Sequence, residues 1–175
     1  MNDVDFDFVV RGMDAKDIEA WFSPRGQIDF VGRTFGVYKF VPEGMNPSRT
    51  PSIDIALPRT ESSHPNSKGG YKEFDVQSDP NLKIEDDLSR RDFTMNAMAI
   101  DLRTHNLIDP FGGEADIDRS IIRAVGDPQT RFNEDLSRML RAIRFAAELH
   151  FEIEEETLTA IKNNIHRIMD TDVVP

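Results

Sequence analysis

The sequence predicts an α+β protein, with strands in its first part and helices in its second. Two observations support this prediction. Over residues 1 to about 80, apolar side chains alternate with polar ones, and a single short helical pattern interrupts them. Two later segments, roughly 133–150 and 155–169, carry apolar residues at the three- and four-residue spacing of helices. Strands first and helices afterwards are typical of α+β folds.

Three stretches of the first part are predicted to form strands. DFDFVV alternates, QIDFVGRTFGVYKFV is rich in β-forming residues broken at Gly32 and Gly36, and SIDIALP alternates again. DAKDIEAWFSPRG has a helical pattern that ends at Pro24 and Gly26. Residues 59–70 are polar and rich in turn-forming residues, so we expect a mobile loop there.

The second part is predicted to be mainly helical. We expect a helix over RRDFTMNAMAID, residues 90–101, although two arginines, an aspartate and an asparagine stand among its apolar side chains. HNLIDPFGGEADI indicates a turn-rich connector, and SIIRAVGDPQTRF begins with a short extended piece. The first long helix is expected to have Asn133 as its N-cap. Its apolar face would comprise Leu136, Met139, Leu140, Ile143, Ala146 and Ala147, and its outer face Glu134, Asp135, Arg138 and Arg141.

Composition excludes several classes of protein. The chain contains no cysteine, which excludes disulfides and thiolate metal sites and fits a reducing cytoplasm. No apolar run approaches the roughly 18 residues of a membrane span, and the N-terminus lacks a signal-peptide pattern. The net charge of −11 is unlike that of proteins that grip a long duplex, so we expect only local binding of a nucleotide or a strand end. The 4 histidines do not have the spacing of zinc ligands.

A pair of carboxylates stands on the first predicted strand. Asp5 and Asp7 are two residues apart, so both side chains point to one face of the strand. Two such carboxylates repel each other unless a cation lies between them, and a pair of Mg²⁺ ions about 3.5–4 Å apart would stabilise them. Asp54, on another alternating strand, is a third candidate. The spacing also fits a solvated acidic face, and Asp3 at the same parity favours that interpretation.

The first long helix carries a second candidate site. Asp135 lies one turn before Arg138, so a hydrogen-bond acceptor would stand beside a donor. Adenine and cytosine each present an amine donor next to a ring-nitrogen acceptor, whereas guanine and uracil present the reverse. The pair would therefore favour A and C over G and U. The same pattern also fits an amphipathic helix whose outer face carries ordinary salt bridges.

Three segments in combination resemble a known family. DFDFVV, RRDFTMNAMAID with the downstream LIDPFGG, and EDLSRMLRAIRFAAEL resemble the class II tRNA nucleotidyltransferases, the CCA-adding enzymes, whose head and neck bacterial poly(A) polymerases share. FVGRTFGVYKF, IDIALPRTE and GGYKEFDV match the intervening pattern in order, so the resemblance runs from about Asp3 to about Ile168. It implies a polymerase-β-type head of mixed sheet and helices, expected at residues 1–112, and the start of a helical neck at 113–175.

The resemblance also implies an activity. CTP and ATP would donate C and/or A to the 3′ end of tRNA by two-metal phosphoryl transfer, with Mg²⁺ as cofactor. The catalytic positions would be Asp5, Asp7 and Asp54, of which Asp5 and Asp7 would bind the metal. The nucleotide-binding positions would be Arg91, Asp92, Asp135, Arg138 and Arg141, together with Asn96, which would share a helix face with Asp92. A structural alternative for Arg91 and Asp92 is a satisfied polar network. Residues 59–70 would form a loop that moves during addition.

The sequence departs from the family pattern at both ends. The family's Gly-Gly segment with its following Arg-Asp, which helps to bind the triphosphate, is missing before Asp5, and the body and tail that hold most of the tRNA are missing after Pro175. We therefore expect a truncated or shortened relative that is inactive or altered on its own. Two alternative functions stay open: a poly(A) polymerase of the same family, and a non-catalytic module that binds nucleotides or proteins.

Overall fold

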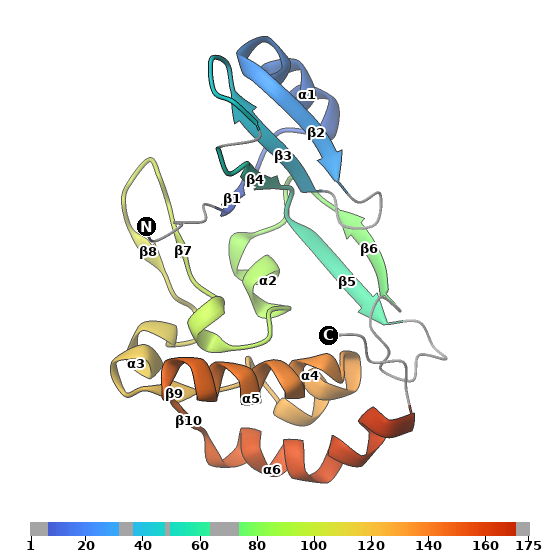
Figure 1. Cartoon of the computed structure of the whole chain (residues 1–175), viewed down its shortest axis with the longest axis vertical. Helices are drawn as coiled ribbons and strands as arrows, with labels where there is room; N and C mark the ends of the chain where they lie inside the picture. The colour runs from blue at the N-terminus through green and yellow to red at the C-terminus, as the bar shows by residue number, and fades with distance from the viewer. Residues whose placement is uncertain (1–6, 32–36, 48–49, 64–73, 171–175) are drawn as a thin grey trace. The chain divides into compact units, whose positions relative to one another are not determined.

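The chain divides into two compact units, each with its own hydrophobic core. Figure 1 shows the helices and strands of both units. The computed structural model describes residues 7–31, 37–47, 50–63 and 74–170. Strands predominate in the first unit and helices in the second, so the predicted α+β class is confirmed. The units divide at residues 84 and 85, whereas the boundary between head and neck at residue 112 stays a prediction about functional parts. The first unit comprises Met1–Glu61 and Asp75–Ile84, and the second Ser62–Phe74 and Glu85–Pro175.

The first unit is built on a mixed four-stranded sheet in the order β1-β4-β3-β2. β1 is parallel to β4, while β3 is antiparallel to both of its neighbours. All three stretches that were predicted to form strands contribute strands to this sheet over their described residues, so that part of the prediction is confirmed. The strands are β1 (Asp7–Val9), β2 (Gly26–Val31), β3 (Val37–Pro42) and β4 (Ile53–Ala56).

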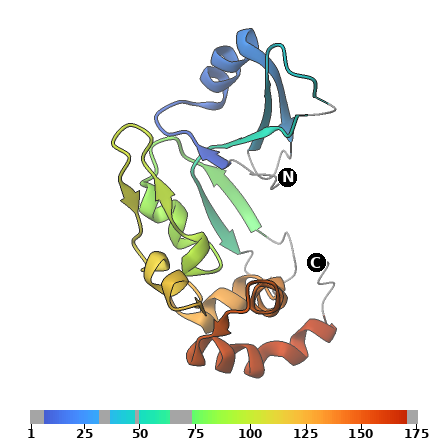
Figure 2. The same cartoon turned by 60° about the vertical axis from the view of Figure 1, so that its left-hand side comes forward.

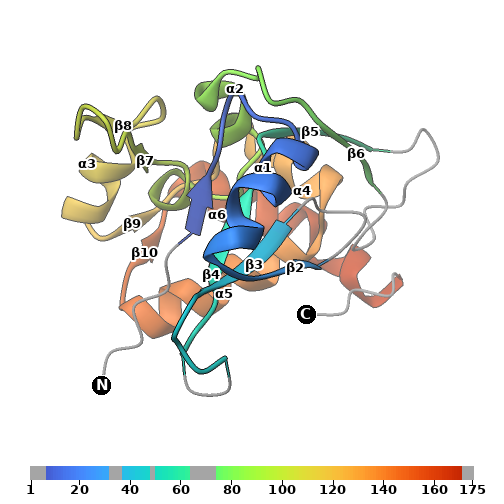
Figure 3. The same cartoon turned by 90° about the horizontal axis from the view of Figure 1, so that it is seen from above.

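Helix α1, Ala15–Phe22, covers one face of this sheet, as the view in Figure 3 shows. Its N-cap is Asp14, whose carboxylate accepts the N–H of Asp17 at 2.9 Å. The short 3₁₀ helix η1, Ser23–Arg25, follows and ends where Pro24 and Gly26 predict a stop. Ile18 is fully buried, and burial of such a side chain contributes about 1.5–3 kcal/mol. Its partners in the core are Tyr38, Phe40, Ile55 and Leu57.

The polar segment after the sheet is partly a strand. β5, Arg59–Ser63, pairs with β6, Phe74–Ser78. The loop expected over residues 59–70 is therefore wrong for 59–63, and 64–70 lie outside the described residues. Local composition missed β5 because strand formation depends on the partner, and β6 supplies the β-forming residues of the pair.

The helix expected over residues 90–101 is wrong. Helix α2, Ile84–Ser89, ends before this segment, and Phe93 is extended with φ −126° and ψ 151°. Phe93 forms a β-bridge to Ala124, and the Thr94 N–H donates to the Arg123 carbonyl at 2.9 Å. These bonds to a distant segment replace the local bonds of a helix. The rest of the stretch is the 3₁₀ helix η2 (Thr94–Asn96) and strand β7 (Ala99–Ile100), which pairs with β8 (Leu107–Ile108).

Helices dominate the remainder of the second unit, and α5 and α6 lie side by side in Figures 1 and 2. The predicted extended piece is β9, which pairs in parallel with β10. Phe132, Met139 and Ile161 bring α4, α5 and α6 into one core. No helix in the described ranges is long and apolar enough to cross a membrane. The elements are α3 (Gly113–Asp118), β9 (Ile121–Ile122), α4 (Pro128–Glu134), α5 (Ser137–Leu149), β10 (Glu152–Ile153), α6 (Glu155–Asn164) and the 3₁₀ helix η3 (Ile165–Asp170).

The first long helix differs from its prediction in start and in orientation. Asn133 belongs to α4, and Asp135 is extended between α4 and α5. Leu136 and Met139 are buried as expected, but Ile143 is 46% exposed and Ala147 is also exposed. Arg138, expected on the outer face, is only 7% exposed. The helix is turned because Phe145 stacks edge-on against Phe93, with ring centroids 6.0 Å apart, and Ala142 joins the core.

Candidate functional site

A row of four charged side chains crosses the sheet of the first unit. The strand register places Asp7 beside Asp54, Asp54 beside Lys39, and Lys39 beside Asp29. Residues in register on neighbouring strands lie on the same face, with the strands about 4.8 Å apart. The apolar residues that pack with α1 alternate with them and lie on the opposite face. We call these four residues the charged row.

The two carboxylates at one end of the charged row differ in their contacts. Asp7 is exposed, whereas Asp54 is 28% exposed and its Oδ1 lies 2.7 Å from Nζ of Lys39. Asp5, which was predicted to bind the metal together with Asp7, lies outside the described residues. Within the ranges that the structure describes, no group of three or more His, Asp or Glu side chains is placed to hold a metal ion. Asp7 and Asp54 nevertheless offer carboxylate oxygens, which are the ligands that Mg²⁺ takes.

Four of the predicted nucleotide-binding residues are gathered in the second unit. Arg141 forms an ion pair with Asp92, with N–O distances of 2.7 Å. Asp92 Oδ1 also accepts the side-chain amide of Asn96 at 3.1 Å and the N–H of Phe93 at 2.9 Å. Arg91 donates to the Asn96 carbonyl at 3.1 Å. Asp92 and Asn96 therefore meet as predicted, although the segment is not an α-helix.

The other two predicted residues, Asp135 and Arg138, have different partners. Arg138 donates to Glu134 Oε2 at 3.0 Å and to the Arg90 carbonyl at 3.1 Å. Asp135 Oδ1 accepts the N–H of Ser137 at 2.8 Å. The break between α4 and α5 gives Asp135 this capping position and makes Glu134 the carboxylate partner of Arg138. One guanidinium thus connects α4, α5 and the segment that carries Arg91 and Asp92.

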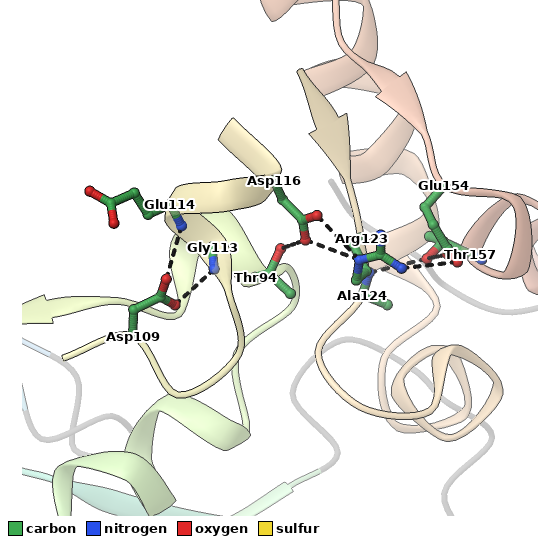
Figure 4. Close-up of polar contacts among 9 residues, drawn as sticks. All are labelled: Thr94, Asp109, Gly113, Glu114, Asp116, Arg123, Ala124, Glu154 and Thr157. Atoms are coloured by element: carbon green, nitrogen blue, oxygen red, sulfur yellow. Dashed lines mark hydrogen bonds and ion pairs between the residues drawn. The ribbon is translucent and has the colours of Figure 1, made fainter. Parts of the chain in front are cut away.

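A buried polar network, missed by the sequence analysis, holds the segment after Asp92 (Figure 4). The Thr94 hydroxyl donates to Asp116 Oδ2 at 2.8 Å, and Arg123 Nε donates to the same oxygen at 3.0 Å. Thr94 and Asp116 are 2% and 4% exposed. The hydrogen bond to Asp116 raises the pKa of Arg123 above its usual range, against the effect of burial. The network therefore fixes Thr94, two residues after Asp92, to helix α3.

Arg123 extends this network toward α6. It forms an ion pair with Glu154 at 3.1 Å. Glu154 Oε2 accepts both the N–H and the hydroxyl of Thr157, each at 2.8 Å, which caps α6. The Thr157 hydroxyl in turn accepts the N–H of Ala124 at 3.1 Å. Sequence spacing gave no signal for the contacts of Thr94 with Asp116 and of Ala124 with Thr157, because these partners lie far apart in the chain. Two contacts had local spacing: Glu154 lies three residues before Thr157, and Asp109, four residues before Gly113, accepts that N–H at 2.7 Å.

We expect Glu154 to make stability depend on pH. Burial raises the pKa of Glu154, but the hydrogen bonds from Thr157 and the charge of Arg123 outweigh burial, so its pKa lies below the usual range. A carboxylate whose pKa falls on folding stabilises the protein above its unfolded pKa, and this stability is lost as pH falls through the folded pKa. Glu154→Gln should therefore lower the free energy of unfolding by about 1 kcal/mol at pH 7 and by less at pH 3.

Urea unfolding at the two pH values measures this difference. Glu148→Gln is the matched control, because Glu148 is exposed on α5 and should change the free energy of unfolding by less than about 0.5 kcal/mol at either pH. An equal loss at pH 7 and pH 3 for Glu154→Gln would show that the carboxylate charge has no part in the network.

The fold and the charged row define the class of protein. A small mixed sheet with neighbouring carboxylates on one face and a helix across the other, followed by helices, is the arrangement of a polymerase-β-type nucleotidyltransferase head with the start of a helical neck. Residues 1–123 match the family model described as the poly A polymerase head domain. The chain belongs to this family.

Similar proteins in this family are CCA-adding enzymes. The CCA-adding enzyme of Lactobacillus helveticus is 45% identical over 113 residues, which cover 65% of this chain and 27% of that protein. The multifunctional CCA protein of Stenotrophomonas maltophilia is 40% identical over 161 residues, covering 90% of this chain and 35% of that protein. The crystal structure of the Bacillus stearothermophilus CCA-adding enzyme in complex with CTP matches with a TM-score of 0.67 and 36% identity, covering 85% of this chain and 32% of that one. The chain thus spans about a third or less of these relatives.

Proposed function

We propose that this chain is the nucleotide-adding part of a tRNA nucleotidyltransferase, which adds C and/or A to the 3′ end of tRNA from CTP and ATP. The observation that carries the proposal is the register of Asp7 with Asp54 in a chain whose relatives are CCA-adding enzymes. Two carboxylates held side by side on a sheet face, with apolar residues fixing the other face, suit the binding of a divalent cation.

The first unit would hold the cation. Asp7 and Asp54, together with Asp5, offer oxygen ligands for Mg²⁺. Bound Mg²⁺ would neutralise the triphosphate and lower the pKa of the attacking 3′-hydroxyl. The sheet keeps Asp7 and Asp54 at a fixed separation, so little reorganisation is needed during the reaction. Lys39 neutralises part of the charge of Asp54.

The second unit would bind the nucleotide. Nε of Arg91 is buried and has no hydrogen-bond partner among the described atoms. An unsatisfied buried donor costs about 1–3 kcal/mol, so a shift of the Arg91 side chain that lets a ligand accept this hydrogen bond would favour binding. Arg141 is 44% exposed, which leaves its guanidinium accessible to a ligand while Asp92 is held. Arg91, Asp92, Asn96 and Arg141 would contact sugar and phosphate.

Asp135 and Arg138 would select the base. Both side chains are held in place by other contacts: Asp135 accepts a hydrogen bond from the Ser137 N–H, and Arg138 donates one to Glu134. Asp135 keeps a second carboxylate oxygen as acceptor, and a guanidinium has five N–H donors in total. An acceptor beside a donor complements A and C and leaves groups unpaired against G and U.

Incorporation of labelled nucleotides tests the function. The purified chain is incubated with Mg²⁺, tRNA that lacks its terminal CCA, and one labelled nucleoside triphosphate at a time. Any incorporation by this chain should be of C or A, with at least about 100-fold less of G and U. Calorimetry with CTP and ATP is run in parallel.

Each alternative has its own outcome in this experiment. Long runs of A on an unrelated RNA would indicate a poly(A) polymerase. Nucleotide binding without any incorporation would indicate a binding module. Equal incorporation of all four nucleotides would contradict the role of Asp135 and Arg138. A chain that neither binds nor incorporates nucleotides would contradict the whole proposal.

A further inference from the structure

Lys39 contributes the only positive charge to the charged row. It lies on β3 in register with both Asp54 and Asp29, and its ammonium contacts Asp54 Oδ1 at 2.7 Å. Neither the spacing of the acidic residues nor the proposed reaction calls for a lysine at this position. The position of Lys39 beside Asp54, a proposed cation ligand, therefore requires a separate explanation.

The contact is poorly suited to a purely structural role. The side chains of Lys39 and Asp54 are 43% and 28% exposed. Ion pairs with this exposure contribute little to stability, because water and salt screen them and both side chains must be ordered. The same exposure makes the contact easy to exchange. A cation that approaches Asp54 can displace the ammonium without leaving a buried charge unpaired.

The repulsion between Asp7 and Asp54 can be offset in two ways. A divalent cation between the carboxylates would offset the repulsion fully, whereas the single charge of the Lys39 ammonium offsets the charge of Asp54. The two solutions compete, because both take an oxygen of Asp54 and both carry positive charge. In water, a unit charge on the order of 6 Å from a divalent ion weakens its binding by roughly tenfold.

We propose that Lys39 is a positioning residue of the cation site. Its ammonium holds the Asp54 carboxylate in place when no cation is bound, and it lowers the affinity of the site for divalent cations by competing for Asp54. The inference rests on the proposed function, since that function assigns the cation to Asp7 and Asp54. The inference gives Lys39 a role in setting the Mg²⁺ concentration at which the site becomes occupied.

Calorimetric titration of the purified chain with Mg²⁺, without nucleotide or tRNA, tests the role of Lys39. Lys39→Met removes the charge and should bind Mg²⁺ about 10-fold more tightly than the wild type. Lys39→Arg keeps the charge and should stay within about 2-fold. Asp29→Asn, at the far end of the charged row, should also stay within about 2-fold. Lys39→Gln is a second charge-removing variant should Lys39→Met fail to fold.

A structural ion pair predicts a different result. It would lower the melting temperature of Lys39→Met equally with and without Mg²⁺ and leave the dissociation constant unchanged. That result would overturn the inference, and so would a failure of both wild type and Lys39→Met to bind Mg²⁺. Tighter binding by Lys39→Met in a chain that incorporates no nucleotide would support the inference and contradict the proposed function. Nucleotide incorporation by the wild type, with the same Mg²⁺ affinity in Lys39→Met as in the wild type, would support the proposed function and contradict the inference.

Discussion

Replacing Asp7 with alanine is expected to slow nucleotide incorporation by a factor on the order of 10³. Asp7 is the register partner of Asp54, so its loss leaves a single described carboxylate to bind the cation. Asp7 is exposed on a three-residue strand, and its replacement should barely change the stability of the fold. Single-turnover incorporation of labelled CTP at saturating Mg²⁺ measures the effect.

The position of Asp29 provides the matched control for Asp7→Ala. Asp29 lies on the same sheet face at the other end of the charged row, beyond Lys39. Asp29→Ala should incorporate CTP within about threefold of the wild type, and Asp7→Ala should still bind CTP in calorimetry. Wild-type incorporation by Asp7→Ala would refute its catalytic role. An equal loss in both variants would show that net negative charge matters and not the position of one carboxylate.

Gly113→Ala is expected to lower the free energy of unfolding by about 3 kcal/mol. A Cβ on Gly113 would come within 2.2 Å of the Thr94 carbonyl oxygen and 2.8 Å of its carbon. These are backbone atoms, so no side-chain rotation relieves the overlap. Thr94 cannot move aside cheaply either, because Asp116 and the Arg123 carbonyl hold it by hydrogen bonds. Urea unfolding with linear extrapolation measures the loss.

Gly112→Ala separates steric overlap from backbone conformation. Gly112 has φ +76° with open space around it, so alanine there meets no atom but adopts the left-handed region at a cost of about 1–2 kcal/mol. We therefore expect the Gly113 variant to be the less stable of the two. The reverse order would mean that α3 can move away from Thr94 and that the network in Figure 4 does not fix the segment.

The sheet was predictable because its signal is local. Alternation in DFDFVV and SIDIALP gave both the strands and the face that carries Asp7 and Asp54. The place of Lys39 beside Asp54 was not predictable, since it depends on the register between β3 and β4, which no local pattern specifies.

The second unit shows the limit of local patterns more clearly. Residues 90–101 have enough apolar residues for a helix, yet Phe93 and Thr94 bond to the chain around Arg123 and Ala124 instead. The Thr94–Asp116 contact joins positions 22 residues apart. Asp92 and Asn96 were paired correctly because that contact spans only 4 residues, a distance at which turn and helix both bring side chains together.

The buried guanidinium of Arg138 has a consequence for how base preference can evolve. Arg138 is bonded to the main chain of Arg90, and its neighbour on the helix, Arg141, holds Asp92. Under the proposed role of Arg138 in base selection, a substitution there would also loosen the segment of residues 90–92, which is proposed to contact the sugar. Specificity changes at this position should be epistatic with residues 90–92, so a lineage would reach a new preference through compensating pairs of substitutions more readily than through single ones.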